Sequence, residues 1–194
     1  MIYIVTALKP EAQAFVDKYK LKKSKRDNYT LFQNENIRLI ISGIGVNNAR
    51  YATQTLINNF DITDDDIYLN VGICAAPPKH TLGELLEIGS ITYRNITYIF
   101  DTDKHTITCK DEEAASEEKT PVDMESFGFY DAVIHNPAIK KFHILKVVSD
   151  HFEPHIITKE KTKSLLFNVI NDINRHLRIT QGVKHGKEKK KSGR

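Results

Sequence analysis

The sequence predicts an α/β fold in which helices cover both faces of a central sheet. Short apolar runs rich in β-branched residues alternate along the chain with longer stretches whose apolar residues recur at helical spacing. This alternation is typical of a largely parallel sheet in a three-layer sandwich. Short strand-like runs crowd between Thr92 and Cys109, so we expect the sheet to be mixed.

The first half of the chain shows this alternation clearly. The run IYIVTA suits a buried strand, and Pro10 suits the first turn of the helix that follows. The turn-like segment NEN joins two alternating runs into a strand pair. Apolar residues at helical spacing from Ala49 to Phe60 predict the next helix. The expected elements are strand 2–7, helix 10–20, strands 28–34 and 36–45, helix 46–60 and strand 66–76.

The second half begins with short strands and then returns to the alternation. Gly or Asn residues punctuate the short apolar runs, which indicates turns between strands. The last stretch has a strongly amphipathic helical pattern. The expected elements are short strands within 83–100 and 105–110, helix 124–136, strand 142–150 and helix 159–177.

Composition limits the class of protein. With 194 residues, 40% of them hydrophobic and 27% charged, the chain has an ordinary globular balance, and we expect one domain over residues 1–182. No apolar run approaches the ~20 residues of a membrane-spanning helix, and the apolar start lacks the basic residues and length of a secretory signal. Cys74 and Cys109 have no metal or redox spacing, so a reducing cytoplasm is the expected location.

The basic residues gather at the carboxyl terminus. Residues 184–194 carry six Lys or Arg and one Glu, whereas the rest of the chain carries 22 basic and 24 acidic residues. A nucleic-acid-binding protein would place its basic residues on a folded face, interleaved with aromatic residues. We therefore expect a disordered basic tail over residues 183–194 and no specific nucleic-acid partner.

Three polar stretches follow predicted strands, where ligands bind in open α/β sheets. They are LKPE, NVGICAA and VSD. Each stretch has two interpretations. Glu11 can serve chemistry or complement a helix dipole, and Asp150 can donate a proton or cap a turn. The small residues of NVGICAA can admit a flat ligand to the backbone or fill a crowded core corner.

Other motifs are weaker. The glycine-rich turn SGIGVNNAR can cradle an anion or a sugar oxygen on its N–H groups, or it can serve close packing alone. It lacks the third glycine of a dinucleotide-binding turn and the Lys of a P-loop. His151, Glu153 and His155 lie close together, but Pro154 prevents a regular helix through them. We therefore expect neither a metal nor another cofactor.

Taken together, six stretches resemble the purine nucleoside phosphorylase / methylthioadenosine–adenosylhomocysteine nucleosidase superfamily. They are VTALKPEAQAF, ISGIGVNNA, NVGICAA, LLEIGSI, PVDMES and KVVSD, and the similarity runs from Met1 to about Leu177. The V-x-M-E and S-D elements are specific as a pair. The resemblance implies a nucleoside phosphorylase-like fold, with a twisted mixed sheet and a small barrel-like portion between helices, and a homodimer.

The resemblance also implies roles for particular residues. Glu11 corresponds to the group that positions and deprotonates an attacking water, and Asp150 to the general acid that protonates the purine at N7. Glu125 corresponds to the ligand of the ribose hydroxyls, which leaves Asp123 a structural role. The remaining implied substrate contacts are Met124 on the sugar, Ser149 beside Asp150, Lys146 where the family often has arginine, and the backbone of Ile73, Cys74 and Ala75.

The implied reaction is hydrolysis of the N-glycosidic bond of a purine nucleoside. Cleavage builds positive charge on the ribose and negative charge on the base, which suits carboxylates near the sugar and an acid near the base. A nucleoside phosphorylase is the second alternative, but the residues around Gly72 include no arginine or serine for phosphate. A non-catalytic nucleoside-binding module is the third, although a binder has little use for both an acid and a base.

One segment departs from the family pattern. Only 29 residues, Thr92 to Thr120, separate IGSI from PVDMES, where the family usually has a much longer insert that forms a wall against the purine. In its place stands CKDEEAASEEKT, with Ala114 and Ala115 where bulkier residues are expected. We expect a base pocket that is open, completed by a second subunit, or altered for another substrate.

Overall fold

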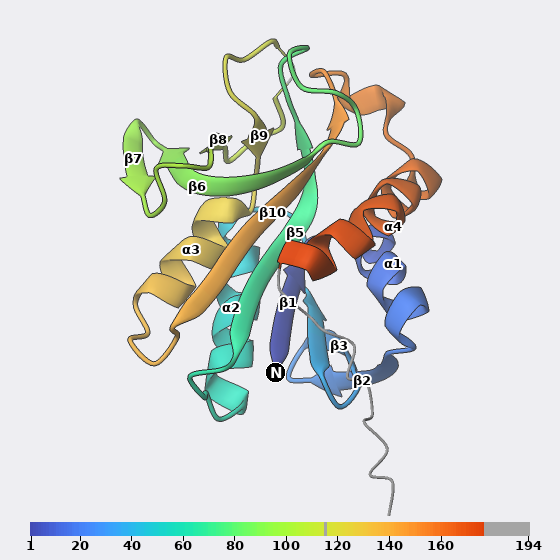
Figure 1. Ribbon diagram of the computed structural model, residues 1–194, viewed down its shortest axis with the longest axis vertical. Coiled ribbons are helices and arrows are strands. Elements are labelled where there is room, and N and C mark those ends of the chain that lie inside the picture. Colours follow the sequence, from blue (N-terminus) through green and yellow to red (C-terminus); the bar gives the residue numbers. More distant parts are fainter. Residues whose placement is uncertain (115, 177–194) are drawn as a thin grey trace, which may run out of the picture.

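The computed structural model describes residues 1–114 and 116–176 and is built on one 10-stranded sheet. Figure 1 shows that sheet between two groups of helices. The strands are β1 Ile2–Thr6, β2 Lys22–Arg26, β3 Tyr29–Gln33, β4 Ile37–Ile41, β5 Ile67–Ala75, β6 Leu85–Tyr93, β7 Ile96–Ile99, β8 His105–Cys109, β9 Val122–Asp123 and β10 Lys141–Asp150. The helices are α1 Lys9–Tyr19, α2 Val46–Asn59, α3 Ser126–Ile134, the 3₁₀ turn Pro154–Ile156 and α4 Lys159–His176.

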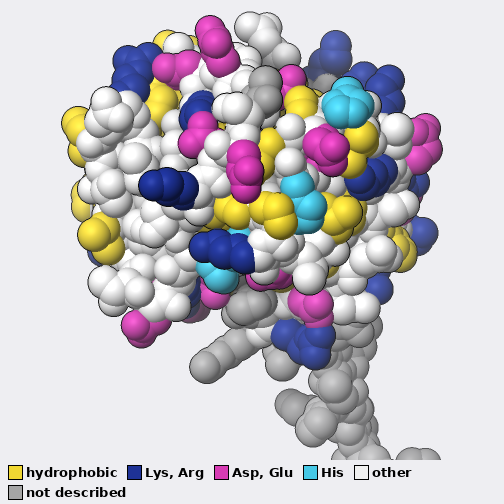
Figure 2. Space-filling view, turned by 90° about the horizontal axis from the view of Figure 1, so that it is seen from above, with side chains coloured by type: hydrophobic (Ala, Val, Ile, Leu, Met, Phe, Trp, Pro, Cys, Tyr) yellow, Lys and Arg dark blue, Asp and Glu magenta, His cyan; other side chains and the backbone are white. Residues whose placement is uncertain are grey.

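Four strands form the parallel centre of the sheet. β1 pairs with β4 and β5, and β5 pairs with β10, all in parallel. Their carboxyl ends therefore lie at one end of the molecule, the upper end in Figure 1. Figure 2 looks onto that end and shows acidic side chains spread over the face, with hydrophobic side chains and a histidine near its middle. The polar stretches singled out in the sequence meet at this end.

The rest of the sheet curls into a small closed ring. β10 pairs antiparallel with β6, β6 pairs with β8, β8 pairs with β9, and β9 returns to pair with β5. Because β5 also pairs with β10, these five strands close on themselves. The mixed sheet and its barrel-like portion were both predicted.

The two faces of the sheet are covered by different helices. α2 packs on α3, and α1 packs on α4. Side chains of β1 alternate between the two resulting cores, as the pleat of a strand requires. Tyr3 and Val5 join the core under α2 and α3, whereas Ile4 joins the core under α1 and α4. The sandwich therefore has two hydrophobic layers with the sheet between them.

Two strands were not predicted, the two-residue β9 and the edge strand β2. β2 has the sequence KKSKR, pairs only with β3 at the edge of the sheet, and exposes most of its side chains. Neither apolar alternation nor β-branched residues signal this strand. Lysines at an exposed sheet edge discourage pairing with another chain, which accounts for a charged sequence here.

Two further expectations concern the basic tail and membrane-spanning helices. The predicted basic tail, residues 183–194, lies outside the described residues. Within residues 1–114 and 116–176, none of the helices has the length and apolar character needed to span a membrane.

The contact between α2 and α3 depends on Gly128. A Cβ atom on Gly128 would lie 1.9 Å from the carbonyl oxygen of Val46, the first residue of α2. No side chain fits there unless the helices separate. This contact fixes the start of α2 against α3, and both helices begin beside the candidate site described below.

We predict that Gly128→Ala lowers the free energy of unfolding by about 2–3 kcal/mol, because overpacking of this kind forces backbone shifts. Urea unfolding of the variant beside the wild type measures the loss. Ile134→Ala is the control, since Ile134 is an exposed residue of the same helix and its truncation should cost under about 1 kcal/mol. Equal stability of Gly128→Ala and wild type would contradict the close contact.

Candidate active site

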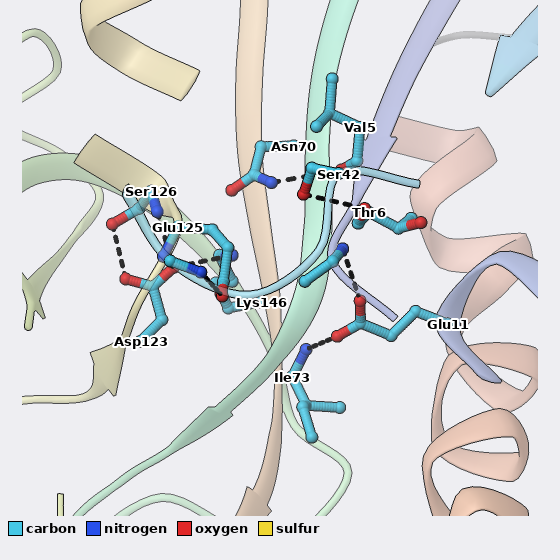
Figure 3. Close-up of polar contacts among 12 residues, drawn as sticks. Val5, Thr6, Glu11, Ser42, Asn70, Ile73, Asp123, Glu125, Ser126 and Lys146 are labelled. Atoms are coloured by element: carbon cyan, nitrogen blue, oxygen red, sulfur yellow. Dashed lines mark hydrogen bonds and ion pairs between the residues drawn. The ribbon is translucent and has the colours of Figure 1, made fainter. Parts of the chain in front are cut away.

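Glu11 enters the site from the first turn of α1 and is 2% exposed. Its Oε2 accepts the N–H groups of Ala7 and Leu8, both at 2.9 Å, so it does cap the helix. Its Oε1 accepts the N–H of Ile73 in β5 at 3.0 Å, a bond that capping does not require (Figure 3). Three of about four lone-pair positions are used. One position on Oε1 remains for a water or a ligand hydroxyl.

Gly72 provides the space for that carboxylate. A Cβ atom on Gly72 would lie 2.8 Å from Oε1 of Glu11 and 3.5 Å from Nζ of Lys146. The sequence left open whether the small residues of NVGICAA admit a ligand or fill a core corner. At Gly72 the group that approaches the backbone is the Glu11 side chain.

Lys146 and Asp123 form a buried ion pair beneath the site. Their Nζ and Oδ2 atoms lie 2.8 Å apart, with side chains 1% and 0% exposed. Asp123 also accepts the N–H of Ser126 at 2.8 Å and its hydroxyl at 2.6 Å, which secures the start of α3. Burial lowers the pKa of Lys146, but the carboxylates of Asp123, Glu125 and Glu11 outweigh it and raise that pKa overall. Lys146 is therefore a fixed positive charge.

Glu125 lies on the other side of this pair, at the start of α3. Its Oε1 accepts the N–H of Gly45 at 3.0 Å. Gly45 has φ of 104°, a conformation that favours glycine. The glycine-rich turn thus does hold an anion on its backbone, and the anion is a side chain of the same protein. Burial and the nearby Asp123 carboxylate raise the pKa of Glu125 to about 7.

Asp150 is the last residue of β10 and is 4% exposed. Its Oδ2 accepts the hydroxyl of Ser149 at 2.6 Å, and its Oδ1 accepts the N–H of Glu153 at 2.9 Å. The second bond is a turn cap, as the structural interpretation of Ser-Asp predicted. The Ser149 hydroxyl also lies 3.1 Å from the carbonyl oxygen of Cys74. The single hydroxyl proton of Ser149 thus has two acceptors within reach, and the shorter contact is with Asp150.

These groups surround one cavity of about 280 Å³, at the lower end of the range for small-molecule sites. The structure brings together on its wall all but one of the predicted site residues, namely Glu11, Ile73, Cys74, Ala75, Met124, Glu125, Ser149 and Asp150. Lys146 is the exception, because it lies behind the wall, paired with Asp123.

Burial raises the pKa of Glu11, while the N–H groups that its carboxylate accepts and the charge of Lys146 oppose that rise.

Comparison with known proteins rests on structure alone. No family model matches the chain, and no curated protein matches its sequence. A methylthioadenosine/adenosylhomocysteine nucleosidase from S. pneumoniae superposes with TM-score 0.74 at 15% identity, over 91% of this chain and 98% of that one. The Colwellia psychrerythraea nucleosidase, in complex with adenine, gives 0.69 at 16% identity over 88% and 94%. The futalosine hydrolase of Helicobacter pylori gives 0.70 at 12% over 88% and 97%.

This chain has the nucleosidase fold. The predicted nucleoside phosphorylase-like architecture is thereby confirmed. In this chain, residues 110–121 connect β8 to β9.

Some residues of the cavity wall were not predicted from the sequence. Glu113 lines the cavity from the segment between β8 and β9, next to Ala114, which the sequence had placed at this wall, and Pro154 and Ile157 line it from beyond β10. The segment was expected to leave the base pocket open, completed by a second subunit or altered for another substrate, and it supplies a carboxylate and a methyl group to the wall. Loop residues without periodicity carry no sequence signal that would have identified them.

We predict that the elevated pKa of Glu125 makes the protein less stable at pH 8 than at pH 5. The folded state holds a proton that the unfolded state releases above about pH 4.5, so this contribution to the free energy of unfolding falls as pH rises toward 7. Glu125→Gln has no proton to lose and keeps an oxygen for the N–H of Gly45. It should gain about 2–3 kcal/mol over wild type at pH 8 and little at pH 5.

Urea unfolding at both pH values measures this difference. Glu117→Gln is the matched control, because Glu117 is an exposed carboxylate outside the cavity and its replacement should change stability equally at both pH values. A gain for Glu125→Gln that is the same at pH 5 and pH 8 would show that Glu125 titrates normally.

Proposed function

We propose that the protein hydrolyses the N-glycosidic bond of a purine nucleoside of the methylthioadenosine or adenosylhomocysteine type. The observation that carries this proposal is one cavity whose wall includes the carboxylates of Glu11, Glu125 and Asp150. Similarity of fold to nucleosidases with adenine or a transition-state inhibitor bound adds support. Cleavage of this bond needs an acid at the base and negative charge near the sugar, and the three carboxylates supply both.

Asp150 is the proposed general acid at N7 of the purine. It lies at the end of β10 with each oxygen held by one hydrogen bond, which leaves a lone pair or a proton on either oxygen for the base. The Ser149 hydroxyl fixes its orientation. Ile73, Cys74 and Ala75, which run along the cavity as the end of β5, offer backbone contacts to the base and ribose.

Glu11 is the proposed acceptor for the attacking water. Its remaining lone pair on Oε1 can accept a water proton, and the buried ammonium of Lys146 favours the ionised form that a base requires. Lys146 acts on Glu11 through space, because it does not reach the cavity wall. This role differs from that of an arginine in direct contact with the water.

Glu125 is the proposed partner of the ribose hydroxyls, with Met124 packing on the sugar. A carboxylate can accept two hydroxyl protons at once, and one of its oxygens is already held by Gly45. Both residues line the cavity at the start of α3. A negative charge placed there also stabilises the positive charge that develops on the ribose.

Water is a better nucleophile than phosphate for this cavity. Five carboxylates line it, and none of its described lining residues is Lys, Arg or His. The five are Glu11, Glu113, Asp123, Glu125 and Asp150. A phosphate anion brought beside them would be repelled, because like charges in a partly desolvated site interact strongly. We also propose a cytoplasmic homodimer; Ile44 on the cavity wall and Tyr51 on α2 are both exposed apolar residues that a second subunit could cover.

We predict that the purified protein releases free purine base from methylthioadenosine at the same rate with and without phosphate. The assay follows base release by chromatography in a phosphate-free buffer and again after addition of phosphate. A rate that appears only with phosphate would make the protein a phosphorylase. Binding of the nucleoside with no release of base under either condition would favour the non-catalytic binding module.

We predict that Asp150→Asn lowers turnover by about 10²–10⁴-fold and leaves nucleoside binding nearly unchanged. Asn keeps an oxygen for the N–H of Glu153, and the Ser149 hydroxyl can turn its proton to Cys74 and accept from the new amide. The variant therefore keeps the turn but cannot deliver a proton.

Base release by the variant and by wild type, with binding measured by calorimetry, tests this expectation. Ser164→Ala on α4, away from the cavity, is the control and should retain full turnover. Turnover of Asp150→Asn equal to that of wild type would leave Asp150 with a structural role only.

A further inference from the structure

Glu113 is a cavity-lining carboxylate that no step of the proposed reaction uses. It lies in the segment between β8 and β9 and lines the cavity beside Ala114. Two other acidic residues of this segment, Asp111 and Glu118, are engaged elsewhere. Asp111 binds Arg94 and the hydroxyl of Tyr93, and Glu118 pairs with Lys110. Among the described residues, Glu113 has no hydrogen-bond or ion-pair partner.

Glu113 is an exposed residue, and its position in the cavity follows from the residue after it, Ala114. Ala114 packs with Phe152, Val122 and Ala75. Ala75 is paired with Asp150 in the register of β5 and β10, and Phe152 follows Asp150 by two residues. Glu113 therefore belongs to the Asp150 end of the cavity, whereas Glu11 lies farther back along β5, at Gly72 and Ile73.

We propose that Glu113 selects the base by accepting a hydrogen bond from an amino group at C6 of the purine. This inference rests on the proposed function, because it takes Asp150 to face N7. C6 carries the purine substituent next to N7, so a group beside the Asp150 end meets that substituent. The side chain thereby determines which purine the site accepts.

The chemistry of the carboxylate decides which substituent fits. A carboxylate only accepts hydrogen bonds, and an amino group at C6 donates them, whereas an oxygen at C6 only accepts. A 6-oxopurine would face Glu113 with oxygen against oxygen and no proton between them. Purine without a substituent at C6 would leave the carboxylate unpaired. The site should therefore prefer 6-aminopurines to both.

The experiment compares binding of adenine and of unsubstituted purine to the full-length protein by titration calorimetry. We expect wild type to bind adenine about tenfold more tightly than unsubstituted purine. This is the effect expected of one charge-assisted hydrogen bond at a partly exposed site. Glu113→Ala should lose most of this preference, and Glu113→Gln, which keeps one acceptor oxygen, should retain part of it. Glu117→Ala is the matched control, since it removes the same charge from the same segment outside the cavity and should keep the preference.

A second measurement separates this inference from the proposed function. Base release is followed from methylthioadenosine and from its 6-oxo counterpart, and Glu113→Ala should reduce the ratio of their kcat/KM values about tenfold. A preference for adenine that Glu113→Ala leaves intact would overturn the inference, whether or not nucleosides are hydrolysed. A preference lost in Glu113→Ala would support it even if wild type releases no base. Failure of wild type to bind either base would overturn the inference about Glu113, whereas the proposed function would still be decided by base release from methylthioadenosine.

Discussion

The arrangement of the site depends on one buried positive charge. Lys146 is 1% exposed, and its ammonium pairs with Asp123 while it also attracts the carboxylates of Glu125 and Glu11. Burying several carboxylates together without a cation would force them to take up protons, because desolvation and mutual repulsion both disfavour the charged form. Lys146 is opposite Gly72 in the pairing of β10 with β5, and the absence of a side chain at Gly72 leaves room for the Glu11 carboxylate beside the ammonium. The register of two parallel strands therefore sets the electrostatics of the whole cavity.

Structural and chemical roles coincide in the carboxylates of this site. Glu11 caps α1, Asp123 secures the start of α3, and Asp150 caps the turn after β10. The structural role expected of each residue is thus correct. Asp123 has one contact beyond this role, its ion pair with Lys146. For Glu11 the bond from Ile73 lies outside capping and ties the helix to the strand. A cap of this kind holds a side chain rigidly, which is what a positioned acid or base requires.

The sequence predicted those features that follow from local patterns. The β-branched runs and helical spacing predicted the parallel centre of the sheet and the helices that cover it, and the strand-end rule predicted the meeting of Glu11 and Asp150. The charged edge strand β2 was missed because its stability comes from pairing with β3 and not from its own pattern. The pairing of Lys146 with Asp123 and the position of Glu113 on the cavity wall were missed for a related reason. Both depend on tertiary contacts between segments that are distant in the sequence or lack regular secondary structure.

The short segment between β8 and β9 is compatible with the site because the ring of strands closes independently of its length. Val122 of β9 pairs with both Ala75 and Thr108, and Asp123 pairs with Cys109. Two residues of strand are thus enough to join β5 to β8 and to place Asp123 against Lys146. The positions of Asp123 and Glu125 are fixed by this closure and by the start of α3, so neither carboxylate depends on the segment before β9. The segment contributes to the wall at the Asp150 end, where it supplies Glu113 and Ala114. Under the proposed function, changes in this segment would alter which base fits while the carboxylates of Asp123 and Glu125 stay in place.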